Sequence, residues 1–176
     1  MQSIFTNTMN KDNLFDLMIE SDIDTVRSIC LTQHISYCND PYFWKLKFGY
    51  DDLPILTKEL PTTLNEWRKE YIRVEKAADL AVEVLEKIKN KMVIFDYNDK
   101  EFNFKEILPF SLRSAMYNYT PKLQSFNKLA ISHHKQNQYW VKLIKNQSES
   151  FNIDFENIYD VLTIIFYHYP NIPYHF

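Results

Sequence analysis

Residues 62–97 read TTLNEWRKEYIRVEKAADLAVEVLEKIKNKMVIFDY, and the period of the apolar residues changes within this stretch. Thr63 and Glu66 stand at the spacing of a capping box, so a helix is expected to begin at Thr62 or Thr63 and run to about Lys91. Its apolar stripe comprises Trp67, Tyr71, Val74, Ala77, Ala78, Ala81, Val84, Leu85 and Ile88. The run that follows is β-branched and aromatic, which is typical of a strand. A long amphipathic helix that leads into a strand predicts an α+β protein.

Beyond this point the sequence predicts a strand pair and a short helix. Residues 98–100 have turn chemistry, and Phe102 and Phe104 alternate after them, so they are expected to pair with 92–97. Residues 109–119 indicate a short helix that ends before a proline.

Residues 124–146 predict a second hairpin, because apolar residues alternate on both sides of a polar turn at 135–138. We expect a break at 148–150 and then a last helix, capped by Asn152 or Asp154. That helix would cover Ile158, Tyr159, Leu162, Ile165 and Phe166 and end before Pro170. The C-terminal part is therefore expected to hold a small, mostly antiparallel sheet and a terminal helix.

Toward the N-terminus the sequence predicts three short helices. The apolar residues that share a face are Leu14, Leu17 and Met18 in the first helix and Ile23, Val26, Ile29 and Cys30 in the second. The third helix would begin with Asp40 as its cap and Pro41 in its first turn. Its apolar residues are Phe43, Trp44, Leu46 and Phe48, whereas Lys45 and Lys47 are expected to point outward.

The three helical segments, NLFDLMIES, DIDTVRSICLTQ and NDPYFWKLKF, together resemble an F-box, in particular the F-box-like proteins of large DNA viruses, or giant viruses. The resemblance covers about residues 12–50. F-boxes commonly begin with Leu-Pro, and this chain has Lys11, Asp12 and Asn13 in that place. The family pattern consists mainly of apolar spacing, so the fold analogy does not by itself assign the function.

The resemblance implies that the N-terminal helices bind a Skp-type adaptor protein of a cullin–RING ubiquitin ligase, while the following domain recruits an unknown protein target. Some of the apolar residues would dock the adaptor, and others would hold the helices together. The positions that the resemblance assigns to adaptor binding are Leu14, Leu17, Met18, Ile23, Val26 and Cys30.

The composition argues against several classes of protein. The formal net charge is -3, which does not favour nucleic acid as a partner. The single glycine argues against the glycine-rich motifs of nucleotide-binding enzymes and against a nucleophile elbow. The N-terminus lacks a signal-peptide pattern, and the longest apolar run, 161–166, is too short to span a bilayer. We therefore expect no catalytic residue, no cofactor and no membrane partner.

Cys30 and Cys38 are expected to be reduced, buried thiols, which would fit an intracellular, cytoplasmic protein (host cytoplasm for a viral one). His133 and His134 stand next to each other in an expected strand, where they would face opposite sides, so a polar hairpin end explains them better than a metal site. Turn and strand-face polarity account for the acidic residues at 96–101.

The predicted organisation is an F-box-like helical unit at 12–50 and an α+β domain at 62–170. The first hypothesis is a non-catalytic interaction protein of the F-box adaptor type. The alternative is a viral structural or assembly protein without a ubiquitin-ligase role. An enzyme without a short motif is the least favoured reading, because no titratable cluster recurs in one segment.

Overall fold

The computed structural model describes residues 11–33, 35–96, 128–144 and 148–176. The described residues form helices and an antiparallel sheet, which confirms the predicted α+β class. The chain divides into two compact units, Met1–Val74 and Glu75–Phe176. We call them the helical unit and the sheet unit, and each is described by itself.

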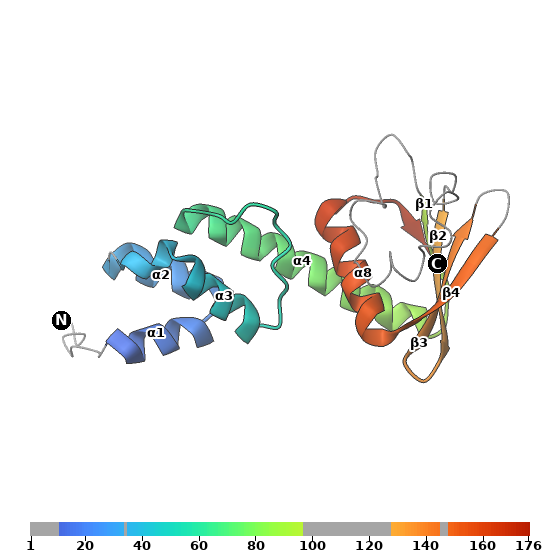
Figure 1. Cartoon of the computed structure of the whole chain (residues 1–176), viewed down its shortest axis with the longest axis horizontal. Coiled ribbons are helices and arrows are strands. Elements are labelled where there is room, and N and C mark those ends of the chain that lie inside the picture. The colour runs from blue at the N-terminus through green and yellow to red at the C-terminus, as the bar shows by residue number, and fades with distance from the viewer. Residues whose placement is uncertain (1–10, 34, 97–127, 145–147) are drawn as a thin grey trace, which may run out of the picture. The chain divides into compact units, whose positions relative to one another are not determined.

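The helical unit contains the three predicted short helices (Figure 1). Its elements are α1 (Lys11–Glu20), α2 (Ile23–Gln33), the 3₁₀ turn η1 (Ser36–Asn39) and α3 (Pro41–Tyr50). The start of α3 is as predicted: the Asp40 carboxylate accepts a hydrogen bond of 2.8 Å from the Tyr42 amide, and Pro41 occupies the first turn.

Helix α4 (Leu64–Ile88) is the long helix that the sequence predicts, and the division between the two units falls inside it. Its capping box is formed, since the Glu66 amide donates to Thr63 Oγ1 at 3.3 Å and the Thr63 amide donates to Glu66 Oε2 at 3.1 Å. The whole predicted apolar stripe is buried. The helix ends three residues before Lys91.

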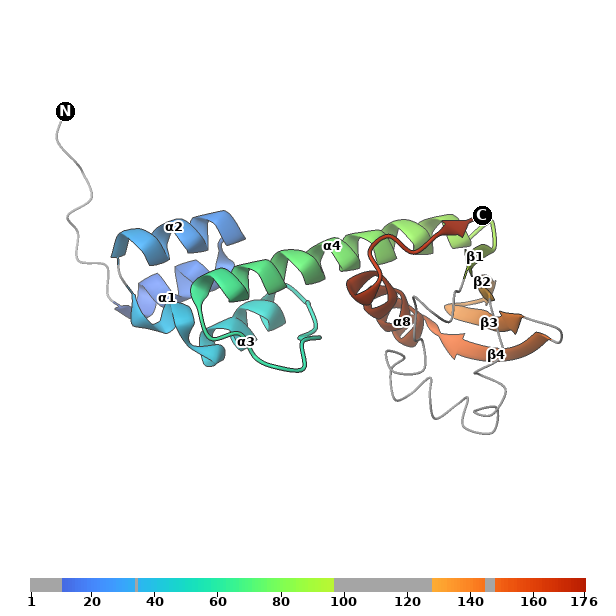
Figure 2. The ribbon, with the colours of Figure 1, turned by 90° about the horizontal axis from the view of Figure 1, so that it is seen from above.

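The sheet unit holds a five-stranded antiparallel sheet among the described residues, in the order β4-β3-β2-β1-β5 (Figure 2). The strands are β1 (Val93–Asp96), β2 (Lys128–Lys135), β3 (Gln138–Ile144), β4 (Ser148–Asp154) and β5 (Tyr174–His175). β1 pairs with β2, with Val93 opposite Ile131, and on its other side with the short β5. The expected strand at Phe102 and Phe104 and the expected helix at 109–119 lie outside the described residues.

The second predicted hairpin is confirmed as β2 and β3, which a two-residue turn at Gln136 and Asn137 connects. The expected break at 148–150 is wrong, because these residues are the first three of β4, which pairs with β3 from Ser148 opposite Ile144 to Asp154 opposite Gln138. Their polar composition suits a strand at the end of the sheet order, where one side of the ladder has no strand among the described residues.

Helix α8 (Phe155–His168) follows directly on β4 and packs against the sheet. Phe166 of α8 and Phe95 of β1 contact edge to face, with ring centroids 5.8 Å apart. The buried residues of β2 and β3, among them Leu129, Ile131 and Val141, complete this core. Among the described residues no helix is both long and apolar enough to cross a membrane.

Candidate interaction surface on the helical unit

An aromatic core joins α3 to the first turns of α4. Trp44 and Trp67 are fully buried and stacked, with ring centroids 5.7 Å apart and an angle of 8° between the planes. Phe48 contacts the rings of Trp67 and Tyr71 edge to face, the latter at 5.4 Å. Burial of several large rings offsets the small size of the unit. The inner side of α3 is therefore held against α4.

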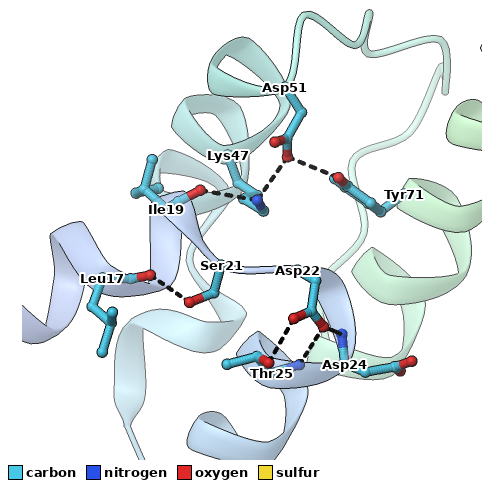
Figure 3. Close-up of polar contacts among 9 residues, drawn as sticks. All are labelled: Leu17, Ile19, Ser21, Asp22, Asp24, Thr25, Lys47, Asp51 and Tyr71. Carbon is cyan, nitrogen blue, oxygen red and sulfur yellow. Dashed lines mark hydrogen bonds and ion pairs between the residues drawn. The ribbon is translucent and has the colours of Figure 1, made fainter.

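Lys47 lies inside this core rather than on the surface, so the expectation that it points outward is wrong (Figure 3). Its ammonium group donates to the Ile19 carbonyl at 2.9 Å and forms an ion pair with Asp51 Oδ2 at 2.7 Å. The Tyr71 hydroxyl donates to the same carboxylate oxygen at 2.8 Å. The last carbonyls of a helix lack partners within the helix, and Lys47 satisfies one at the end of α1. A single side chain thus joins α1 to α3, and through Asp51 to α4.

The turn between α1 and α2 is held by local hydrogen bonds (Figure 3). Ser21 Oγ donates to the Leu17 carbonyl at 2.6 Å. Asp22 caps α2, since its Oδ1 accepts from the amides of Asp24 at 3.0 Å and Thr25 at 2.9 Å. These bonds, that from the Thr25 amide first, hold the pKa of Asp22 below its usual value.

The two cysteines form a disulfide, Cys30–Cys38, so the prediction of reduced thiols is wrong. Cys30 lies near the end of α2 and Cys38 in η1, eight residues later. The reversal of the chain between these elements brings the two Cα atoms to 5.9 Å, within the normal range for a disulfide. This removes the cysteine-based ground for an intracellular location.

The six positions that the F-box resemblance assigns to adaptor binding divide into two sets. Met18, Val26 and Cys30 are buried in the helical unit. Leu14 and Ile23 are partly exposed, and Leu17 is 41% exposed. Only the second set could contact a partner without the unit opening.

A larger apolar surface lies on α3, at positions that the resemblance did not indicate. Tyr42 (63% exposed), Leu46 and Tyr50 follow one another at intervals of four residues, so they share one side of the helix. Gly49 belongs to the same side, and a β-carbon placed on it would have no atom within 4 Å. We call these four residues the α3 face. The signal in the sequence was the spacing of Tyr42, Leu46 and Tyr50 at intervals of four residues, but it does not say which side of the helix is buried.

His133 and His134 are exposed at the β2–β3 hairpin end. The ring of His133 contacts Tyr139 and that of His134 contacts Trp140, with centroids 5.6 and 5.2 Å apart. Within the described ranges, no group of three or more His, Cys, Asp or Glu side chains could hold a metal ion.

The described part of the sheet unit has a shallow apolar depression with a volume of about 360 Å³. Its lining comes from the C-terminal half of α4, the turn that follows it and α8, and comprises Val82, Leu85, Glu86, Lys89 and Tyr159. Glu86 and Lys89 contribute opposite charges to a lining that is otherwise largely apolar.

No family model, no curated protein and no solved structure matches this chain.

Proposed function

We propose that this chain is a non-catalytic interaction protein whose helical unit docks a Skp-type adaptor in the cytoplasm and whose sheet unit recruits a target protein. The observation that supports the docking is the α3 face, where large apolar side chains remain exposed on a small, otherwise well-packed unit. Exposed apolar side chains gathered on one element are typical of a protein–protein interface. Leu17 of α1 is an additional exposed apolar side chain of the same unit.

Gly49 indicates what kind of partner fits the α3 face. Glycine in a helix is less favourable than alanine by about 0.5–1 kcal/mol, and neither a positive φ nor a neighbouring atom in the described residues requires it here. The left-handed position after α3 is instead taken by Asp52, with a φ of 53°. A missing side chain on an exposed helix face allows another backbone to approach closely, as a crossing helix does at 8–10 Å or less. A helical partner, such as an adaptor of this type, suits this surface.

A second candidate is a viral structural or assembly protein, and the disulfide favours it. Disulfides persist in oxidising surroundings and are rare in the cytosol, where ubiquitin ligases work. In this case the α3 face would join the chain to other structural proteins, and no Skp-type adaptor would bind.

The test is calorimetry of the full chain with a purified Skp-type adaptor. We expect one-to-one binding with a Kd in the micromolar range or tighter, weakened at least about 100-fold by Gly49→Arg, whose side chain blocks close approach. The matched control is Gly49→Ala, which adds one carbon and should stay within about 10-fold of the original affinity. Because nothing lies within 4 Å of a β-carbon at this position, neither change disturbs the internal packing.

Further variants separate docking from folding. Leu46→Asp and Leu17→Asp change exposed positions of the helical unit, and Val82→Asp changes an exposed position of the sheet unit. We expect Leu46→Asp to weaken adaptor binding, while Val82→Asp leaves it unchanged. Val26→Asp is unsuitable, since Val26 is fully buried and a carboxylate there would unfold the unit. Absence of binding at tens of micromolar would refute the adaptor function and leave the structural role.

A further inference from the structure

The Cys30–Cys38 disulfide occupies the interior of the helical unit. Cys30 is 5% exposed and Cys38 is 2% exposed, and they are the two cysteines of the whole chain. We propose that this bond is a redox lock on the α3 face, by which we mean that the oxidised bond stabilises the face. A thiol reductant can reduce the disulfide only after the helical unit itself has opened.

The lock acts through η1, the turn that carries Cys38 and precedes α3. The Cys38 carbonyl accepts a buried hydrogen bond of 2.9 Å from Trp44 Nε1 on α3. Next to it, the ring of Tyr37 contacts Phe15 of α1 at 5.3 Å and Phe43 of α3 at 5.9 Å. The disulfide therefore links α2 covalently to η1, the turn whose contacts position α3.

The same turn is also tied to α4. The amide of Leu64, in the first turn of α4, donates to Asn39 Oδ1 at 2.7 Å. Without the bond to Cys30, η1 would depend on hydrogen bonds such as these and on the aromatic contacts around Tyr37. A closed loop of this length limits the freedom of the unfolded chain, and a small helical unit depends strongly on such a constraint.

The burial of both sulfur atoms determines how the Cys30–Cys38 disulfide is reduced and formed. Disulfide exchange needs a thiolate to reach a sulfur atom, and a buried sulfur is reached only in an opened state. The bond is formed by a disulfide oxidant such as oxidised glutathione. One cysteine thiolate displaces one glutathione thiolate to give a mixed disulfide, and the second cysteine thiolate then displaces the other. The two cysteines lose two electrons and two protons in total, and two molecules of reduced glutathione carry them away.

The test measures reduction of the oxidised full chain by dithiothreitol, with free thiols trapped by N-ethylmaleimide and counted by mass spectrometry. We expect reduction at least about 100-fold slower than that of oxidised glutathione, because the open state is rare. The rate should rise steadily with urea concentrations below the unfolding midpoint. Reduction of the native protein as fast as that of oxidised glutathione would overturn the proposal.

A second measurement follows the stability of the helical unit that carries the α3 face. We expect reduction to lower the Tm of the helical unit by about 10–20 °C, and the Cys30→Ser/Cys38→Ser variant to have that lower Tm with or without reductant. A Tm that changes by less than about 2 °C would show that the bond holds nothing in place. These results do not depend on any adaptor: slow reduction without adaptor binding would refute only the proposed function.

Discussion

At the scale of single residues, Lys47 shows how a charged group contributes from inside a small core. Its methylene chain lies among aromatic rings, and its ammonium group lies 5.7 and 5.8 Å from the ring centroids of Tyr50 and Tyr71. The Ile19 carbonyl and the Asp51 carboxylate each accept a hydrogen bond from one of its three N–H groups. A buried charge is tolerated when it is paired and hydrogen-bonded in this way.

We expect Lys47→Met to lower the free energy of unfolding by about 2 kcal/mol, because it leaves the Ile19 carbonyl and the Asp51 carboxylate without the cation. The matched control is Lys45→Met, an exposed position of the same helix, which should change the free energy by less than about 0.5 kcal/mol. Urea unfolding followed by circular dichroism measures both. Equal effects of the two changes would contradict the role given to Lys47.

Asp22 makes stability depend on pH at the acid end. Its pKa is lowered in the folded state, so the folded protein binds fewer protons than the unfolded chain near the ordinary value of 3.8. The stabilisation that the ionised Asp22 carboxylate contributes is thus complete above about pH 3.8, and it is lost as the pH falls through the folded-state pKa. We expect Asp22→Asn, which keeps a capping oxygen, to flatten the decline of the urea midpoint between about pH 4 and pH 2. Asp79→Asn, an exposed carboxylate on α4, serves as control, and an unchanged decline in the Asp22 variant would argue against this contribution.

At the scale of elements, the β2–β3 hairpin combines a favourable pattern with an unfavourable turn. Gln136 and Asn137 have φ values of 34° and 61°, and such left-handed positions favour asparagine and glycine. The chain places a glutamine at the first of them. The strands on either side, rather than the turn, must therefore carry the pairing.

Gln136→Asn combined with Asn137→Gly should stabilise the sheet unit by about 0.5–1 kcal/mol, because Asn-Gly suits both positions of the turn. The matched control is Gln138→Gly at the first position of β3, where glycine weakens a strand and the sign should reverse. Thermal unfolding followed by circular dichroism distinguishes the two. Destabilisation by the Asn-Gly pair would mean that the turn has another geometry.

At the scale of the whole molecule, the helical unit and the sheet unit use different means of stabilisation. The helical unit has a disulfide, a buried lysine and a chain of contacting aromatic rings. The sheet unit has strand pairing and an apolar helix, α8, against the sheet. The chain contains two cysteines, and both belong to the helical unit.

A reductant should therefore act on one unit alone. We expect calorimetry of the full chain to show one thermal transition that dithiothreitol moves downward and one that it leaves within about 2 °C. Hydrogen exchange at the amides of β2 and β3, with and without reductant, identifies the second transition. Loss of protection in these strands on reduction would show instead that α4 transmits the effect.

The extent to which the sequence predicted the structure differs between local and distant features. The start of α4, its buried stripe, the cap of α3 and the β2–β3 hairpin were predicted, since periodicity and capping act over a few residues. The surface formed by Tyr42, Leu46 and Tyr50 was not predicted, because an aromatic residue can lie on either side of a helix.

The sequence by itself thus determined the helices α1 to α4 and α8, the strands β1 to β3, and which face of α4 is buried, but not the strands β4 and β5. Only the tertiary structure decided that Lys47 lies inside, that Cys30 meets Cys38, and that β1 pairs with β2 and β5. The physical reason is that propensity, capping and periodicity depend on neighbours along the chain. Burial and pairing depend on which distant segments come together, and no local pattern encodes that choice.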